Sequence, residues 1–147
     1  MLTIDASLAI RAAVDGDEVA LDAFAGWSRG GVDLVAPDLW LPESITAVRR
    51  SVAQRRRSAK DGEAVIGDLF DLPIRSLPID RALGVAALRW AARLGQHKAY
   101  DALYLAVAER HEVPLVTADD RLLARCQQLG IDFVQGLPEQ GLSQDAG

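Results

Sequence analysis

The segment "YDALYLAVAERHEVPLVTADDRLLARCQQLG", Tyr100 to Gly130, contains the pattern that decides the fold. Its first part, Tyr100–His111, is apolar on almost every side in its middle, which predicts a buried helix. A short apolar and β-branched run, Pro114–Thr117, predicts a strand, and Asp120–Gly130 returns to helical spacing. A buried helix, a strand and another helix in succession indicate a parallel sheet covered by helices.

The same alternation continues toward the N-terminus and the C-terminus. Further strands are expected at residues 2–5, 32–37, 74–79 and 132–135, and further helices at 8–14, 18–28, 39–56, 62–72 and 80–95. Pro42 must lie in the first turn of the helix 39–56 or kink this helix, because it has no amide hydrogen to donate. We therefore predict one α/β domain over residues 1–135, with a parallel sheet of about five strands between two layers of helices. Residues 136–147 are expected to form a polar tail.

Composition limits the class of protein. The 147 residues, half of them hydrophobic, suit one domain with a full core. One cysteine, Cys126, and two histidines exclude an internal disulfide and a Cys/His zinc site, which favours a reducing, cytoplasmic setting. The chain has no apolar run long enough to span a membrane, and its N-terminus does not resemble a secretory signal.

The charge is distributed unevenly along the chain. The net charge of −5 argues against non-specific nucleic-acid binding. However, the segment 49–60 is purely basic in its charged residues, while the rest of the chain carries ten basic against twenty-one acidic residues. The basic run consists of Arg49, Arg50, Arg55, Arg56, Arg57 and Lys60. In the predicted helix Arg49 and Arg56 lie two turns apart and could share a face, but not all six basic residues can. A solvated helix face is the simplest interpretation of the run.

Four acidic residues are expected at one edge of the sheet. Asp5 and Asp119 follow the strands at 2–5 and 114–117, whereas Glu43 and Asp101 lie in the first turns of two helices. The carboxyl ends of parallel strands share one edge, and the helices that follow begin there, so the four carboxylates can converge. Like charges in proximity raise one another's pKa, and a hard divalent cation removes this cost. The pattern indicates a metal-dependent phosphodiester hydrolase acting by in-line attack.

Each acid also has a purely structural interpretation. Asp5 can cap a helix that begins at Ala6, and Asp101 can be an ordinary first-turn acid. Thr117 and Asp120 stand three residues apart before an apolar run, which is the spacing of a capping box in which neither acid binds metal.

Four blocks of sequence, "IDAS", "APDLWLPESITAVRR", "AYDALYLAVAE" and "PLVTADDRL", resemble the PIN-domain family. Their order, spacing and context are most similar to the VapC-type toxins of bacterial and archaeal toxin–antitoxin pairs, and the resemblance covers nearly the whole chain. It implies a compact three-layer α/β/α fold and a Mg²⁺- or Mn²⁺-dependent endoribonuclease.

The resemblance also implies roles for individual residues. Asp5, Glu43, Asp101 and Asp119 would be catalytic, and the three aspartates would hold the metal. Ser7 and Thr117 would help to hold the site or a phosphate. Two positions depart from the family or leave a choice open. The family commonly has Asn three residues after the Glu, where this chain has Thr46, and Asp120 is a possible substitute for Asp119.

The resemblance implies RNA as substrate, a small VapB-type antitoxin whose tail enters the acidic groove, and a homodimer. On this basis the basic run would contact RNA phosphates or an acidic partner. His97 and Lys98 can approach the substrate or form a plain polar loop. Trp40 is expected in the core or a dimer contact, although it could stack on a base.

Three alternatives remain at the level of sequence. One is a PIN-fold RNA-processing nuclease without an antitoxin, and another is a catalytically silent binding module of the same fold. The third is a receiver-type phosphoacceptor domain. The receiver domain usually needs paired acids after the first strand and a late lysine, whereas here the first strand carries only Asp5 and no lysine follows Lys98.

Overall fold

The computed structural model of this chain describes residues 1–138, and within them five short strands form one sheet. All neighbouring strands are parallel, in the order β3-β2-β1-β4-β5. The strands are β1 (Leu2–Ile4), β2 (Leu34–Pro37), β3 (Ile74–Leu77), β4 (Leu115–Thr117) and β5 (Val134–Gly136). The parallel five-stranded sheet expected from the sequence is confirmed.

Helices connect each strand to the next, as predicted. They are α1 (Ala6–Ala9), α2 (Glu18–Arg29), α3 (Trp40–Ala53), α4 (Ala59–Asp71), α5 (Arg81–Leu94), α6 (Tyr100–His111) and α7 (Asp120–Gln128). The first helix continues as a π-helical turn, η1 (Ile10–Val14).

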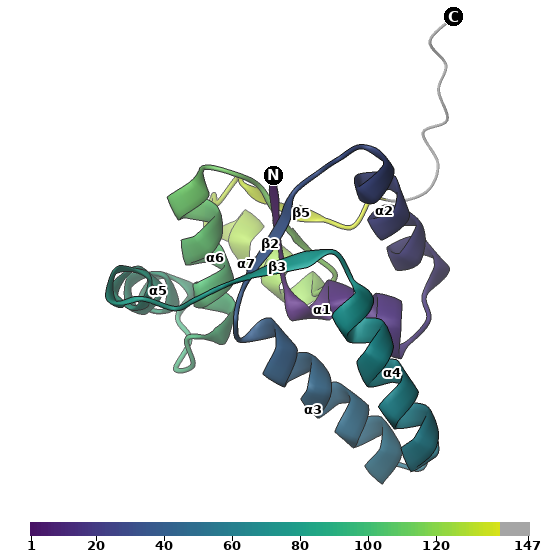
Figure 1. Cartoon of the computed structure of the whole chain (residues 1–147). Helices are drawn as coiled ribbons and strands as arrows, with labels where there is room; N and C mark the ends of the chain where they lie inside the picture. The colour runs from purple at the N-terminus through teal and green to yellow at the C-terminus, as the bar shows by residue number, and fades with distance from the viewer. Residues whose placement is uncertain (139–147) are drawn as a thin grey trace, which may run out of the picture.

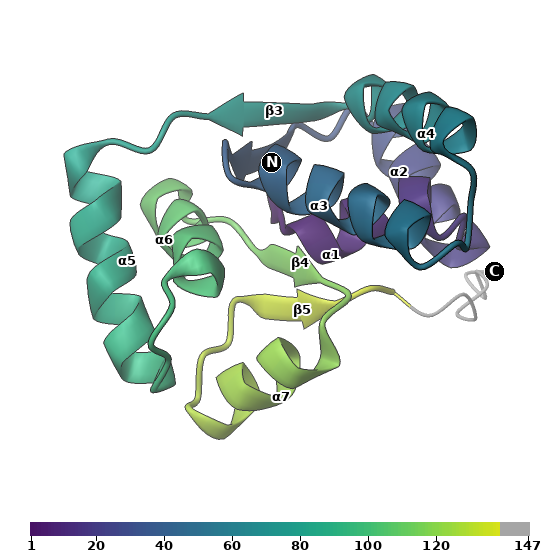
Figure 2. The ribbon, with the colours of Figure 1, turned by 90° about the horizontal axis from the view of Figure 1, so that it is seen from below.

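The helices form a layer on each face of the sheet, which completes the predicted three-layer fold (Figures 1 and 2). On one face, α1, η1 and α2 bury Ile4, Leu34 and Val116 of the three central strands. The neighbouring helices α3 and α4 pack on each other and on η1, and extend beyond the sheet edge (Figure 1). On the other face, α6 contacts β1, β2 and β4, with α5 packed outside it and α7 against β4 and β5.

Helix α6 is buried through most of its length because the sheet lies beneath it and α5 covers it. The buried residues are Ala102, Tyr104, Leu105, Ala106, Val107 and Ala108. This confirms the buried helix expected from the apolar segment at Tyr100–His111.

Helix α3 ends three residues earlier than predicted, at Ala53 instead of residue 56. Arg55 takes a left-handed conformation with φ of 56°, and the Arg56 amide donates to the Ser51 carbonyl at 2.9 Å. This is a Schellman-type helix end with arginine at the position where glycine is usual, so no residue type at this position indicates a helix end. The prediction that Arg49 and Arg56 share a helix face is therefore wrong.

Helix α4 begins three residues earlier than predicted, at Ala59 instead of Gly62. The Ser58 hydroxyl caps it by accepting the Asp61 amide at 3.0 Å. Gly62 is instead a packing residue, since a Cβ built there would lie 2.8 Å from Cγ2 of Val52 on α3. The α3–α4 contact therefore depends on the absence of a side chain at Gly62.

The predicted tail at residues 136–147 is wrong at its first residue. Gly136 is the last residue of β5 and pairs with Thr117, and a Cβ there would lie 3.1 Å from Cδ2 of Leu123. Residues 139–147 of this predicted tail lie outside the described residues. In the part of the chain that is described, no helix is long and apolar enough to cross a membrane.

The strand order places a topological switch point between β1 and β4. The chain leaves β1 toward β2 on one side, and leaves β4 toward β5 on the other. Ligands of open parallel sheets bind at the carboxyl edge at such a point. Asp5 and Thr117 stand at the ends of these two strands.

Candidate active site

Asp5 is held at the switch point by two hydroxyl groups. Ser7 donates to its Oδ1, and Thr117 from the neighbouring strand donates to its Oδ2 at 2.5 Å. Both hydroxyls also accept backbone amides, from Ala118 to Ser7 at 2.9 Å and from Asp119 to Thr117 at 3.0 Å. The amides orient the hydroxyl oxygens, so each O–H points at the carboxylate. Asp5 occupies the N-cap position of α1, but its carboxylate is committed to these side chains.

Burial makes the ionised form of Asp5 costly. The residue is only 6% exposed, and its pKa rises from 3.8 to about 6. Burial is the main cause, and the charge of Asp101 raises the pKa further, whereas the Ser7 and Thr117 hydroxyls lower it. A carboxylate of this kind gains by binding a cation.

Glu43 lies in the first turn of α3 and meets α6. Its Oε1 accepts a hydrogen bond from the Tyr104 hydroxyl at 2.8 Å. Tyr104 is 2% exposed, and burial followed by the charge of Glu43 raises its pKa, so the phenol keeps its proton and remains a donor. Burial also raises the pKa of Glu43, the Tyr104 hydrogen bond lowers it, and Asp101 raises it again.

Asp101, in the first turn of α6, is the link between the other two acids. Its charge raises the pKa of both Asp5 and Glu43, and Asp101 and Glu43 line one hollow. Gln96, in the loop between α5 and α6, donates to Oδ2 of Asp101 at 2.8 Å. This interaction orients Asp101 without neutralising it.

A hollow of about 400 Å³ opens beside Glu43 and Asp101. Its other walls come from the α5–α6 loop and the start of α6: Gly95, Gln96, His97, Lys98 and Tyr100. From the sequence, His97 and Lys98 could either contact the substrate or form an ordinary polar loop. In the structure they line the hollow beside the acids.

Asp119 caps a helix in the structure. It is the N-cap of α7, and its Oδ1 accepts the amides of Arg121 at 2.9 Å and Leu122 at 3.2 Å. The Thr117–Asp120 capping box is wrong, because Asp119 supplies the cap and Thr117 turns to Asp5. Within residues 1–138, no three acidic, histidine or cysteine side chains already surround one point as a metal site would.

The other predicted supporting residues, Asp120 and Thr46, are exposed. Asp120 lines a hollow with Arg11, Leu123 and Thr117, and Thr46 lines a groove that includes Glu43. Thr46 is exposed on α3 and its hydroxyl donates to the Pro42 carbonyl at 2.8 Å.

The basic run divides into parts with different surroundings. Arg49, Arg50, Arg55, Arg56 and Lys60 are exposed. Arg57 is half-buried, and its Nη2 donates to the Val14 carbonyl at the end of η1 at 2.5 Å. Arg57 thus ties the α3–α4 connection to the first helix, whereas Arg50 lines a groove that also includes Glu43.

Two residues of the site were not predicted from the sequence. Tyr104 had a usable signal, because a phenol within a buried helix needs a partner for its hydroxyl, and it lies one turn after Asp101. Gln96 had none, since a glutamine in a polar loop is ordinary.

Comparison with known proteins agrees with this architecture. The model of the PIN domain family matches residues 2–127. Ribonuclease VapC12 of Mycobacterium tuberculosis is 32% identical over 126 residues, 83% of this chain and 89% of the relative. The structure of PAE2754 from Pyrobaculum aerophilum aligns with a TM-score of 0.67 and 23% identity, covering 92% and 90% of the two chains. A chain of VapBC2 from Rickettsia felis, solved bound to a promoter DNA fragment, aligns with a TM-score of 0.69 and 10% identity over 93% and 98%. The chain therefore belongs to the PIN domain family.

Proposed function

We propose that this chain is a metal-dependent endoribonuclease and the toxin of a VapBC-type toxin–antitoxin pair. The observation that carries the proposal is the position of three acids near the switch point of the sheet: Asp5 follows β1 and is held by Thr117 of β4, and Glu43 of α3 and Asp101 of α6 line one hollow. The similarity to Ribonuclease VapC12 over most of both chains supports the substrate class.

The residues present fit a hard divalent cation. Every donor is a carboxylate oxygen, which suits Mg²⁺ or Mn²⁺. Asp5 and Asp101 would hold the ion, with Asp119 contributing through Oδ2, since Oδ1 is occupied by the α7 amides. Because these side chains do not yet surround one point, binding would draw them together. The bound ion would lower the pKa of a water molecule and neutralise charge on the phosphoryl oxygens.

The remaining side chains would orient the acids and handle the proton. Ser7 and Thr117 hold both oxygens of Asp5, and Gln96 holds Asp101. Glu43 is suited to take the proton from the attacking water, because burial raises its pKa and Tyr104 fixes one of its oxygens. The water oxygen would then bond to phosphorus as the bond to the leaving ribose oxygen breaks, and that oxygen would take a proton from solvent.

The proposed partners follow from the relatives. The Rickettsia felis structure contains VapBC2, which supports a VapB-type antitoxin as the partner of this chain. We infer that the antitoxin tail enters the acidic hollow, that the toxin forms a homodimer and that both act in the cytoplasm. A neighbouring open reading frame for a short DNA-binding protein would distinguish this pair from an RNA-processing nuclease that acts alone.

The proposal is tested by RNA cleavage with the chain purified free of any partner. Cleavage is expected with Mg²⁺ or Mn²⁺ and should stop in excess chelator, because the carboxylates alone cannot neutralise the phosphoryl charge. Restoring the metal should restore the activity. Full cleavage in chelator would rule out the mechanism, and a complete lack of cleavage under all conditions would favour the catalytically silent binding module.

A further inference from the structure

A second hollow continues from the acids along α3. It measures about 600 Å³ and shares Glu43, Lys98 and Tyr100 with the hollow that contains Asp101. Leu39, Thr46 and Arg50 are among the residues that line only this second hollow. The two hollows therefore form one groove, with Glu43 and Tyr100 at the junction.

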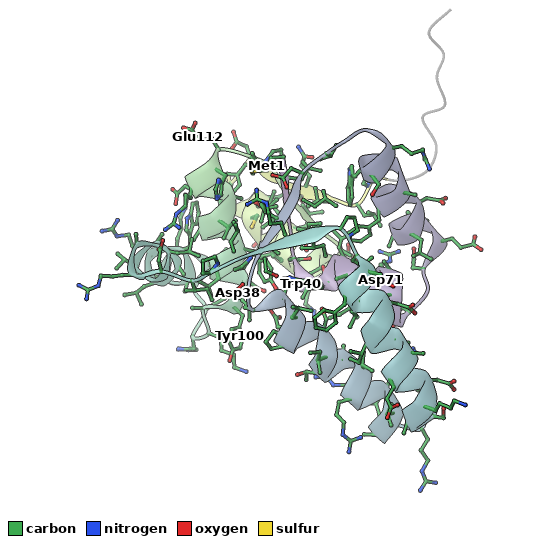
Figure 3. All side chains as sticks on the ribbon, in the orientation of Figure 1. Met1, Asp38, Trp40, Asp71, Tyr100 and Glu112 are labelled. Atoms are coloured by element: carbon green, nitrogen blue, oxygen red, sulfur yellow. The ribbon has the colours of Figure 1, made fainter. Side chains whose placement is uncertain are left out.

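Tyr100 is the aromatic side chain exposed at this junction. It is the first residue of α6, 54% exposed, and lies below α6 near the start of α3 (Figure 3). Trp40, the residue for which the sequence suggested base stacking, is 3% exposed and donates from Nε1 to Ser76 Oγ at 2.8 Å. The ring available beside the acids is therefore that of Tyr100.

The charges of the groove change along its length. Glu43 and Lys98 line both hollows, whereas Asp101 lines only the hollow at the switch point and Arg50 lines only the hollow along α3. The groove is therefore more acidic at its Asp101 end and more cationic at its Arg50 end. Cations suit the phosphates of a nucleic-acid strand, and an exposed ring between cations and acids suits one of its bases.

We propose that Tyr100 stacks on an unpaired base next to the cleaved phosphodiester, while Arg50 and Lys98 contact the phosphates that follow along the groove. This inference rests on the proposed function, since it places the reacting phosphate at the acids. The base that stacks on Tyr100 must be unpaired, because bases within a duplex are not free to stack on a side chain.

The test is RNA binding in chelator, where the proposed cleavage is switched off. The probe is a fluorescein-labelled single-stranded oligoribonucleotide of mixed sequence, and the readout is its anisotropy. Tyr100→Ala should weaken binding about tenfold, the size of one lost base–aromatic stack. Tyr100→Phe should bind like the parent chain, because it keeps the ring. Phe70→Ala is the matched control, since Phe70 is 63% exposed on α4 and lines neither hollow.

Salt dependence separates stacking from charge. Lys98→Gln should reduce the slope of log affinity against log salt by about 0.7, the value for one phosphate contact on a single strand. Tyr100→Ala should leave the slope unchanged. An unlabelled RNA duplex should displace the labelled single strand from the parent chain poorly. If Tyr100 contacts no base, the duplex should displace it as well as an unlabelled single strand does.

The inference is overturned if Tyr100→Ala binds the single strand as tightly as Phe70→Ala, or if Tyr100→Phe loses as much as Tyr100→Ala. It is also overturned if Tyr100→Ala weakens only the binding of a protein partner, which would make the groove a protein-docking surface. The Mg²⁺ cleavage assay tests the proposed function separately. If the parent chain cleaves RNA and Tyr100→Ala binds RNA with unchanged affinity, only the base site is ruled out. If RNA binding depends on Tyr100 but no cleavage occurs, only the proposed function is ruled out.

Discussion

At the scale of single residues, the burial of Asp5 makes stability depend on pH. Its pKa is about 6 in the folded chain against an ordinary value of 3.8. The unfolded chain therefore releases this proton first as the pH rises, and the free energy of unfolding falls between about pH 4 and pH 6. The loss is at most roughly 3 kcal/mol by the usual conversion of a pKa difference.

Asp5→Asn should remove this pH dependence. In chelator at pH 8 the variant should unfold at a higher urea concentration than the parent chain, and at pH 4 the difference should disappear. The exposed Asp132→Asn is the control and should behave like the parent chain at both pH values. An equal difference at pH 4 and pH 8 would contradict the account of Asp5.

Two substitutions distinguish the role of Asp119 from that of Asp120. Asp119→Asn should leave stability within about 0.5 kcal/mol, because asparagine caps helices as well as aspartate does. It should lower RNA cleavage about tenfold or more, because it removes a charge from the proposed metal site. Asp120→Asn, at an exposed first-turn position, should cost at most about 1 kcal/mol and spare cleavage. Full cleavage by Asp119→Asn would leave Asp119 as a helix cap alone.

The sequence predicted the positions of those site residues that stand where a parallel strand ends or the following helix begins. Asp5, Glu43 and Asp101 were predicted to meet because strands end and helices begin at one edge of a parallel sheet. In the structure Glu43 and Asp101 line one hollow and the charge of Asp101 raises the pKa of Asp5, whereas a shared metal site of the three acids stays a prediction. This rule does not predict the direction in which the Asp119 side chain points. Whether an acid after a strand turns to its own helix or to a neighbour depends on local backbone geometry, which the sequence does not specify.

At the scale of elements, the contact between α3 and α4 rests on Gly62. Gly62→Ala should lower stability by about 1–3 kcal/mol, because the added methyl would overlap Val52 where two helix backbones approach. Gly67→Ala is a matched control in the same helix. A Cβ at Gly67 meets nothing within 4 Å, so this variant should gain up to about 1 kcal/mol from helix propensity. Thermal or urea unfolding that ranks the two variants equally would contradict the packing account.

The α3–α4 contact also shows which features of helices and strands can be predicted from the sequence. Hydrophobic periodicity identified every helix and strand in order, because each element buries a face or a whole surface. The ends of α3 and α4 were each missed by three residues. Arg55 adopts a left-handed conformation that is usual for glycine, and Gly62 is in the helix for packing, so both residues are misleading when taken as helix-end signals.

At the scale of the whole molecule, the site exists only when the sheet is complete. The Thr117–Asp5 hydrogen bond joins residues 112 positions apart, and the Tyr104–Glu43 bond joins residues 61 apart. The parallel order of β1, β2 and β4 brings these segments to one edge. The alternation of strands and helices therefore predicted the position of the site, while the polar contacts that orient each acid required the structure.

The central claim is that Asp5, Glu43 and Asp101 act together as one metal-dependent site for RNA hydrolysis. Asp101 is the most informative position, because its charge raises the pKa of both other acids. In chelator, Asp101→Asn should be at least as stable as the parent chain, since the substitution relieves repulsion. Its inactivity would then not reflect misfolding.

The most direct measurement is the rate of RNA cleavage in Mg²⁺ by the partner-free parent chain, Asp101→Asn and the control Asp132→Asn. We expect the parent chain and Asp132→Asn to cleave equally, and Asp101→Asn to show no cleavage at any Mg²⁺ concentration while remaining folded. A folded Asp101→Asn that cleaves RNA at the parental rate would contradict the claim that these carboxylates form the active site.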